Sequence, residues 1–162
     1  MQLFIIRHAE AHPGTPDEGR ELTEKGRQTV KKMAAFLKKR RIVNFDEVRH
    51  SSLARCRQTA EIIKRELKLA AELKEDKRLH PEVDAGILAS WLDSMPARRA
   101  ASKRSIMLVG HNPQLILLAA KLVIGEEDEE LFLLKKCGVI CLERNEQFRW
   151  SLSWMLSPQL LF

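Results

Sequence analysis

The sequence predicts an α/β fold, in which short buried strands alternate with amphipathic helices along a chain of 162 residues. Two stretches carry most of this prediction. Leu3 to Ile6 and Ser105 to Val109 are short apolar runs containing β-branched residues, which is typical of strands buried on both faces. Polar residues follow each run at once, so each strand delivers titratable side chains to its carboxyl end, where open α/β sheets bind ligands.

Helices and further strands alternate through the first half of the chain. Thr23 is an expected N-cap, because its hydroxyl can accept a hydrogen bond from a free N–H group of the first helical turn. Apolar residues at helical spacing continue that helix to about Arg40. The other elements expected here are a strand from Asp46 to Arg49, a helix that follows Ser51 and reaches about Leu67, and a short strand from Glu72 to Lys74.

The second half of the chain returns to the sheet several times. The expected elements are helical pieces from Gly86 to Met95 and from Pro96 to Ser102, the strand at Ser105, and a helix to about Ile124 with Asn112 as N-cap and Pro113 as its first residue. Strands are then expected over Leu131 to Lys135, Gly138 to Glu143 and Phe148 to Met155, with a hairpin turn at Arg144 to Glu146. Trp150 and Trp154 are four residues apart, which predicts that both lie on one face of the last strand.

The length and composition indicate one domain, residues 1–162. A chain of this size with 44% hydrophobic residues can bury a substantial core. No apolar run approaches the roughly 20 residues of a membrane span, and no basic segment leads into a signal-peptide core. We therefore expect a cytoplasmic protein that has no membrane partner.

The net charge of +6 raises the question of a nucleic-acid surface. A block of basic residues lies between Lys25 and Arg41, but apolar residues recur within it at helical spacing. That pattern favours the solvated face of an amphipathic helix. We expect no nucleic-acid partner and assign the positive charge to the attraction of an anionic substrate.

Neither the cysteines nor the histidines predict a metal site. Cys56, Cys137 and Cys141 are odd in number and lack CxxC spacing, which indicates free thiols. His8 and His12 are four residues apart, but the glutamate of a helical zinc motif does not directly follow the first histidine. We expect no metal and no cofactor.

Charged side chains gather instead at the ends of separate predicted strands. Arg7 and His8 follow the first strand, Arg55 the second, Glu82 and Asp84 the third, and His111 the fourth. Two arginine forks and a cationic imidazole could bind a phosphoryl group, while a second, neutral imidazole could attack its phosphorus in line. The constellation predicts phosphoryl transfer without a metal.

Three segments resemble the signature of the histidine phosphatase superfamily, the branch that includes the phosphoglycerate mutases. The segments are Arg7-His8-Ala9-Glu10, Ser51-Ser52-Leu53-Ala54-Arg55-Cys56-Arg57-Gln58-Thr59-Ala60 and Val109-Gly110-His111-Asn112-Pro113. The resemblance implies a phosphoglycerate mutase-like, three-layer α/β/α fold with a mostly parallel central sheet. It also implies that His8 is the nucleophile, Arg7 and Arg55 clamp phosphate, and His111 stabilises the transition state. Arg20 is a candidate further phosphate contact.

Within the superfamily the chain most resembles the compact phosphohistidine phosphatases of the SixA type. About thirty residues separate Lys74 from Ser105, so the lid over the site is expected to be reduced, as suits a bulky substrate. The mutases have a glutamate in the region of Glu82, whereas the compact relatives have a pattern that selects Asp84. Either carboxylate can therefore be the proton donor.

Three functions are compatible with these residues. The first is a phosphatase that removes phosphate from phosphohistidine on a protein, through a covalent phosphohistidine of its own. The second is a general phosphomonoesterase acting on small phosphorylated metabolites. The third is a catalytically idle phosphate-binding module, which the presence of Arg7, His8, Arg55 and His111 argues against.

Overall fold

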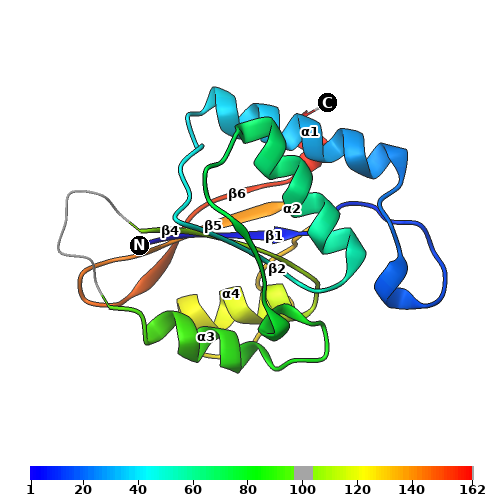
Figure 1. Ribbon diagram of the computed structural model, residues 1–162. Helices are drawn as coiled ribbons and strands as arrows, with labels where there is room; N and C mark the ends of the chain where they lie inside the picture. Colours follow the sequence, from blue (N-terminus) through cyan, green and yellow to red (C-terminus); the bar gives the residue numbers. More distant parts are fainter. Residues whose placement is uncertain (97–103, 162) are drawn as a thin grey trace.

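A six-stranded, mostly parallel sheet forms the centre of the computed structural model, which describes residues 1–96 and 104–161 (Figure 1). The strand order is β3-β2-β4-β1-β5-β6. β3, β2, β4 and β1 are parallel to one another, whereas β5 is antiparallel to both β1 and β6. The strands are β1 (Gln2–Arg7), β2 (Glu47–His50), β3 (Leu73–Glu75), β4 (Ser105–Gly110), β5 (Val139–Arg144) and β6 (Trp150–Leu156).

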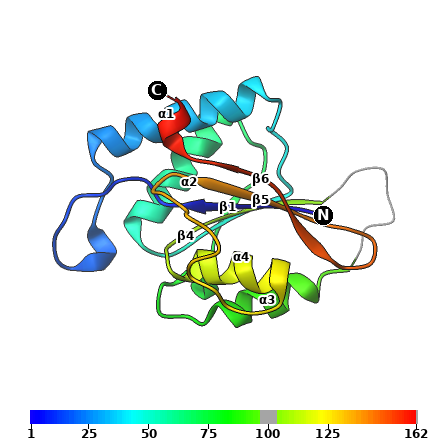
Figure 2. The ribbon, with the colours of Figure 1, turned by 180° about the vertical axis from the view of Figure 1, so that it is seen from behind.

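Helices cover both faces of the sheet, which confirms the predicted three-layer α/β/α fold. Figures 1 and 2 show α1 and α2 on one face and α3 and α4 on the other. The helices are α1 (Glu24–Lys39), α2 (Ala54–Leu67), α3 (Ala85–Asp93) and α4 (Gln114–Ile124), with short 3-10 turns at Asp17–Gly19, Lys77–Leu79 and Pro158–Leu161. Because α3 packs beside α4 as part of the outer layer, it forms no large lid.

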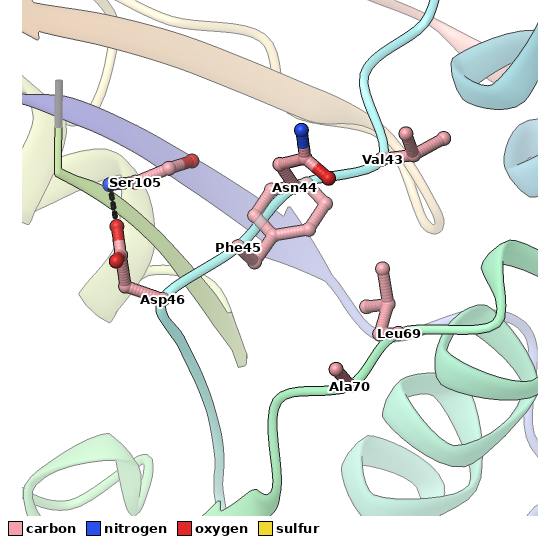
Figure 3. Close-up of a pocket in the computed structure, with 7 residues that line it drawn as sticks. All are labelled: Val43, Asn44, Phe45, Asp46, Leu69, Ala70 and Ser105. Carbon is pink, nitrogen blue, oxygen red and sulfur yellow. Dashed lines mark hydrogen bonds between the residues drawn. The ribbon is translucent and has the colours of Figure 1, made fainter. Parts of the chain in front are cut away.

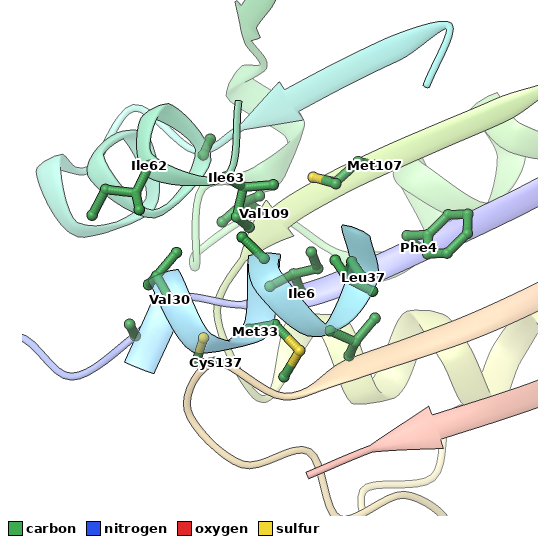
Figure 4. Packing of buried hydrophobic residues seen from close by; sticks show 14 of the residues in the cluster. Phe4, Ile6, Val30, Met33, Leu37, Ile62, Ile63, Met107, Val109 and Cys137 are labelled. Atoms are coloured by element: carbon green, nitrogen blue, oxygen red, sulfur yellow. The ribbon is translucent and has the colours of Figure 1, made fainter. Parts of the chain in front are cut away.

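The central strands are apolar throughout because each supplies a core on both faces of the sheet. In β1, Phe4 and Ile6 point toward α1 and α2 (Figure 4), whereas Leu3 and Ile5 point toward α3 and α4. The period of two that separates these pairs is the geometry of an extended strand. Fully burying such a side chain contributes about 1.5–3 kcal/mol, so the two cores hold β1 rigidly behind the residues that follow it.

The start of α1 confirms the expected cap and explains a glycine in the first turn. The Thr23 Oγ1 accepts a hydrogen bond from the Gly26 N–H at 2.9 Å. A Cβ at Gly26 would overlap the carbonyl oxygen of Glu10. The loop after β1 therefore packs directly against the α1 backbone, and the Thr23 N–H donates to the same Glu10 oxygen at 3.0 Å.

The prediction of a strand over Leu131 to Lys135 is wrong. Leu131 and Leu133 are exposed while Phe132 and Leu134 are buried, so the alternation of side chains is present. The backbone nevertheless pairs with no strand in the described ranges. The Leu134 carbonyl instead accepts hydrogen bonds from two side chains, those of Arg7 at 3.1 Å and Asn112 at 3.0 Å.

The same contacts correct the expected cap of α4. Pro113 occupies the N-cap position, and no side chain caps the helix there. The Asn112 Nδ2 donates to Leu134, and its Oδ1, the atom that would cap a helix, accepts no hydrogen bond in the described ranges. Of the two helical pieces expected after the third strand, the first corresponds to α3, and the second, Pro96 to Ser102, falls outside the described residues apart from Pro96.

The two tryptophans of β6 lie on opposite faces of the sheet, contrary to expectation. Leu152 pairs with Leu142 and Trp154 pairs with Cys141, so β6 carries one extra residue at a bulge. Trp150 accordingly packs with the α3 and α4 core, whereas Trp154 contacts the α1 and α2 core. The β5–β6 turn also begins one residue later than predicted, at Asn145.

A hollow of about 220 Å³ lies at the amino ends of β2 and β4 (Figure 3). Apolar side chains form most of its wall, and the Asp46 carboxylate accepts a hydrogen bond from the Ser105 N–H at 2.8 Å. Because β1, β2 and β4 are parallel, this hollow lies at the amino ends of the strands, whereas Arg7 and His111 lie at their carboxyl ends. It belongs to no predicted site.

No helix in the described ranges combines the length and apolar character needed to cross a membrane.

Candidate active site

The carboxyl ends of β1, β2 and β4 bring together four of the predicted site residues. Arg7 ends β1 and His8 follows it, Arg55 lies in the first turn of α2 after β2, and His111 directly follows β4. Backbone hydrogen bonds fix these ends, since the His8 N–H donates to Gly110 at 3.0 Å. Arg7 and Arg55 lie within regular elements and His8 and His111 directly follow strands, so the topology of the sheet brings the four residues together.

The His8 ring presents one unprotonated nitrogen to the site. Its Nδ1 lies 2.7 Å from the Ala9 carbonyl oxygen, and because that oxygen only accepts, Nδ1 must carry the proton. The Nε2 then carries no proton, and its lone pair accepts a hydrogen bond from the Arg55 Nε at 3.3 Å. Burial, together with the charges of Arg55 and Arg7, lowers the pKa of His8 to about 4. At neutral pH, His8 therefore offers Nε2 as a nucleophile.

The second imidazole, His111, lies beside the first, with ring centroids 5.1 Å apart. Its Nε2 is 3.0 Å from the Ser51 hydroxyl and 3.2 Å from the Cys56 sulfur. Burial, followed by the proximity of His8 and Arg55, lowers the pKa of His111 to about 3. His111 is therefore neutral in the free site, because burial disfavours its charged form before an anion is bound, and a cationic imidazole facing a bound phosphoryl group stays a prediction.

Arg55 and Arg7 supply the positive charge that the histidines lack. Arg55 is 6% exposed, and its two terminal nitrogens donate to the Asp17 carboxylate and to the Asp17 carbonyl oxygen, each at 2.9 Å. Arg7 donates through Nη1 to Leu134, while its buried Nε has no hydrogen-bond partner within residues 1–96 and 104–161. Burial lowers the pKa of Arg7, which nevertheless remains a cation at neutral pH. Two guanidinium groups thus border the His8 ring.

The Gln58 and Thr59 side chains connect α2 to the loop that follows β1. The Thr59 hydroxyl donates to the Arg55 carbonyl at 2.7 Å and accepts from the Ala9 N–H at 3.2 Å. The Gln58 carbonyl oxygen accepts from the Leu22 N–H at 2.9 Å. The part of the signature that follows Arg55 therefore ties α2 to the loop after β1 and sets the distance between Arg55 and His8.

Three of the predicted site residues are not brought into this cluster. Arg20 donates to the His12 carbonyl and to Asp17, and reaches Arg55 only through that carboxylate. Asp84 caps α3, where its side chain accepts from the Gly86 N–H at 2.6 Å. The Glu82 side chain is 88% exposed and lies 4.0 Å from His80. No contact joins either carboxylate to His8 or His111 in the described structure.

Sequence reasoning missed several groups that contact the cluster. Asp17 comes from a proline- and glycine-rich loop and Leu134 from a segment interpreted as a strand, so neither carried a local signal. Lys136 is near enough that its charge contributes to lowering the pKa of His8. Cys56 directly follows Arg55 in the Ser51 to Ala60 segment, and this position is the one feature of the sequence that could have placed it at the site. Burial raises the pKa of Cys56, so it stays a thiol.

The depressed histidine pKa values predict how stability depends on pH. An unfolded histidine has a pKa of 6.5, whereas the folded values are about 4 for His8 and about 3 for His111. As pH falls below 6.5, the unfolded chain takes up protons before the folded protein does, so folding stability present above pH 6.5 is lost on the way to pH 4. Urea unfolding at several pH values should show this loss, and a His8→Asn variant should show a smaller one.

The described residues contain no group of three or more His, Cys, Asp or Glu side chains that could hold a metal ion. Positive charge at the site comes from Arg7 and Arg55 instead. We therefore expect phosphatase activity to survive dialysis against EDTA. A loss of activity that added zinc or magnesium restores would contradict this expectation.

This geometry places a neutral imidazole, His8, near two arginines at the carboxyl ends of parallel strands, as a phosphoryl-binding site requires. Residues 3–98 match the family model described as histidine phosphatase superfamily (branch 1). The chain belongs to the histidine phosphatase superfamily, which implies phosphatase activity, and the predicted family is confirmed.

One relative and two solved structures illustrate the similarity. An uncharacterized protein of Picosynechococcus sp. (strain ATCC 27264 / PCC 7002 / PR-6) is 34% identical over 150 residues, which cover 88% of this chain and 84% of the relative. The protein histidine phosphatase SixA complexed with tungstate superposes with a TM-score of 0.87 at 27% identity over 100% of both chains. An Entamoeba histolytica phosphoserine phosphatase complexed with 3-phosphoglyceric acid shares the fold, with a TM-score of 0.72 at 19% identity over 99% of both chains.

Proposed function

We propose that this protein is a metal-independent phosphatase that removes phosphate from phosphohistidine on a protein substrate. The observation that carries the proposal is the pairing of an unprotonated His8 Nε2 with the Arg55 guanidinium, in a cluster where, among residues 1–96 and 104–161, Asp17 is the carboxylate that contacts Arg55. Similarity to SixA-type phosphatases along the whole chain supports it. The acting unit that we propose is the single domain formed by residues 1–162.

The proposed first step transfers the phosphoryl group to His8. The Nε2 lone pair forms a bond to phosphorus while the bond from phosphorus to the substrate imidazole breaks. The leaving nitrogen keeps the electron pair, and the proton already on the other ring nitrogen of the substrate makes the leaving group a neutral imidazole. Arg7 and Arg55 donate hydrogen bonds to the phosphoryl oxygens, and His111 contributes a further ring nitrogen beside them. The arginines and His111 act by electrostatic stabilisation and positioning, as phosphoryl transfer requires.

The proposed second step regenerates the free enzyme. Water attacks phosphorus, the bond from phosphorus to the His8 Nε2 breaks, and inorganic phosphate leaves. One hydrogen of the water stays on the new phosphate oxygen, the other leaves as a proton to solvent, and His8, which keeps its Nδ1 proton, returns to its neutral form. The exchange consumes one water and requires no oxidant, reductant or metal.

The weak connection of Glu82 and Asp84 to the cluster favours a phosphoramidate over an ester. An imidazole leaving group can carry a proton near neutral pH, so it departs without a strong general acid. An alkoxide leaving group needs that acid. Since Asp84 caps a helix and Glu82 is exposed, neither is placed to assist ester cleavage in this structure.

The test compares kcat/KM for a histidine-phosphorylated phosphotransfer domain and for a sugar phosphate. We expect the phosphoprotein to be the better substrate of the wild type. A double Glu82→Gln, Asp84→Asn variant should keep phosphohistidine turnover, because neither carboxylate contacts the cluster; the asparagine can still cap α3. A wild type that prefers the sugar phosphate would replace this proposal with a general phosphomonoesterase of small metabolites. Absence of turnover on both substrates would indicate an idle phosphate-binding module.

A further inference from the structure

The arginine that the proposed mechanism assigns to phosphate already holds an anion. The Arg55 Nη2 donates to the Asp17 carboxylate at 2.9 Å, and the Nη1 donates to the carbonyl oxygen of the same residue, also at 2.9 Å. Both terminal nitrogens of the fork are therefore directed at two oxygen atoms of one residue. This is the pattern by which a guanidinium binds two oxygens of a phosphoryl group.

Asp17 lies on the solvent side of this arginine. The Arg55 side chain is 7% exposed, whereas the Asp17 side chain is 50% exposed. Asp17 is therefore the solvent-exposed partner of the pair and occupies both terminal nitrogens of a buried arginine. The Arg55 hydrogen bond lowers the pKa of the Asp17 carboxyl, so the carboxylate is charged at neutral pH and repels an incoming anion.

The segment that carries Asp17 is built so that it can move. Asp17 lies in a 3-10 turn, Asp17–Gly19, that contains no buried residue. The turn belongs to a loop that projects beyond the sheet and helices (Figures 1 and 2). No apolar core would be exposed if this turn shifted, so its displacement costs little beyond the contacts of its polar groups.

A second arginine can keep the carboxylate once it leaves Arg55. The Arg20 Nη1 donates to the Asp17 carboxylate at 2.9 Å, and the Arg20 Nε is fixed to the His12 carbonyl at 2.7 Å. Arg20 therefore has a stable position outside the cluster while it holds Asp17. This gives Arg20 a place in phosphate binding different from the direct contact predicted from the sequence.

We propose that Asp17 occupies the phosphate clamp of the free enzyme and that the incoming phosphoryl group displaces it toward Arg20. The inference deepens the proposed function, since it rests on Arg55 as a phosphate ligand. A phosphoryl dianion carries twice the charge of a carboxylate and more acceptor oxygens, so it can displace Asp17, whereas a monoanion gains little. Asp17 thus sets the affinity of the clamp and its selectivity for dianions, and it favours release of the phosphate product.

The opposite role for Asp17 makes the opposite prediction. If the carboxylate served only to orient the Arg55 fork, its removal would leave the fork mobile and weaken phosphate binding. If Asp17 competes with phosphate, its removal strengthens phosphate binding. The sign of the change in phosphate affinity therefore separates a competing anion from an orienting one.

The experiment is calorimetric titration of inorganic phosphate into the wild type and into Asp17→Ala, Asp17→Asn and Glu18→Ala. Glu18 is the exposed neighbour in the same turn, so Glu18→Ala removes one negative charge without touching the clamp. We expect Asp17→Ala to bind phosphate about fivefold more tightly, the order expected for loss of a half-exposed ion pair, with Asp17→Asn in between. Glu18→Ala should bind as the wild type does.

Acetate provides a second readout, because it is a carboxylate like the one removed. Acetate should compete with phosphate in Asp17→Ala and should not do so in the wild type. Unchanged or weaker phosphate binding by Asp17→Ala or Asp17→Asn, in protein that keeps its circular dichroism spectrum, overturns the inference alone. If Asp17→Ala fails to fold, the Asp17→Asn titration decides. A wild type that binds no phosphate overturns the proposed function as well.

Discussion

Replacing His8 with alanine should abolish turnover, with a loss of at least about 10⁴-fold, because nothing else in the cluster can replace a covalent nucleophile. The fold should survive. The His8 ring is held mainly by the Ala9 carbonyl and by Arg55, while the core strands around it are stabilised by their own apolar side chains. The measurement is the rate of phosphate release from a histidine-phosphorylated domain.

The same substitution should remove a covalent intermediate that can be trapped. Phosphohistidine is labile in acid, so the enzyme should be quenched under alkaline conditions after reaction with radiolabelled phosphoprotein. The wild type should retain label, and His8→Ala should not. His12→Ala is the matched control, because His12 is exposed in the loop four residues later and should keep both label and turnover. Wild-type turnover in the His8→Ala variant would exclude the proposed nucleophile.

The predictable part of the fold is the part in which local pattern and tertiary environment agree. The β1 and β4 runs are apolar at every position because both faces of the sheet are covered, and burial on both faces leaves a continuous run in the sequence. Thr23 caps α1 through atoms three residues away. Such features are determined within one turn or one strand, and the sequence displays them directly.

The errors in the fold come from partners that lie far away in the sequence. Asn112 was expected to cap α4 with its side-chain oxygen, but its amide N–H donates to the Leu134 carbonyl, twenty-two residues later, and its Oδ1 accepts no hydrogen bond in the described ranges. Alternating burial at Leu131 to Leu134 resembles a strand because one side faces the core, yet burial of one side does not supply a hydrogen-bonding neighbour. The bulge in β6 inverts the face of Trp154 through a single extra residue.

The candidate site divides in the same way. Residues at strand ends were predictable because topology alone places them together, as for His8 and His111. Asp17 was not, since a loop carboxylate becomes a site residue only through the position of the Arg55 side chain, 38 residues later. The position of Asp84 was open to two interpretations, proton donor or helix cap, because an aspartate just before a helix is a good N-cap, and the structure shows the cap.

The second large effect is expected from Arg55→Lys, which should fold normally and lose on the order of 10²-fold or more in kcat. In the structure, the Arg55 Nε donates to the His8 Nε2 while its terminal nitrogens form a separate two-point clamp. A lysine ammonium preserves the charge but is a single point on a flexible stem, so it cannot hold His8 and the phosphoryl oxygens together. Steady-state kinetics with the phosphoprotein substrate measure the loss.

Arg57→Lys is the control for this prediction, because it makes the same chemical change two residues away on the same helix. The Arg57 side chain is 51% exposed and lies 3.8 Å from Glu61 across one helical turn. Such a surface pair contributes about 0.3–0.5 kcal/mol, and a lysine can replace it. Arg57→Lys should therefore keep wild-type kcat and thermal stability. If Arg55→Lys also keeps near-normal kcat while remaining folded, the guanidinium fork is not required at the transition state, and Arg55 has only a structural role in α2.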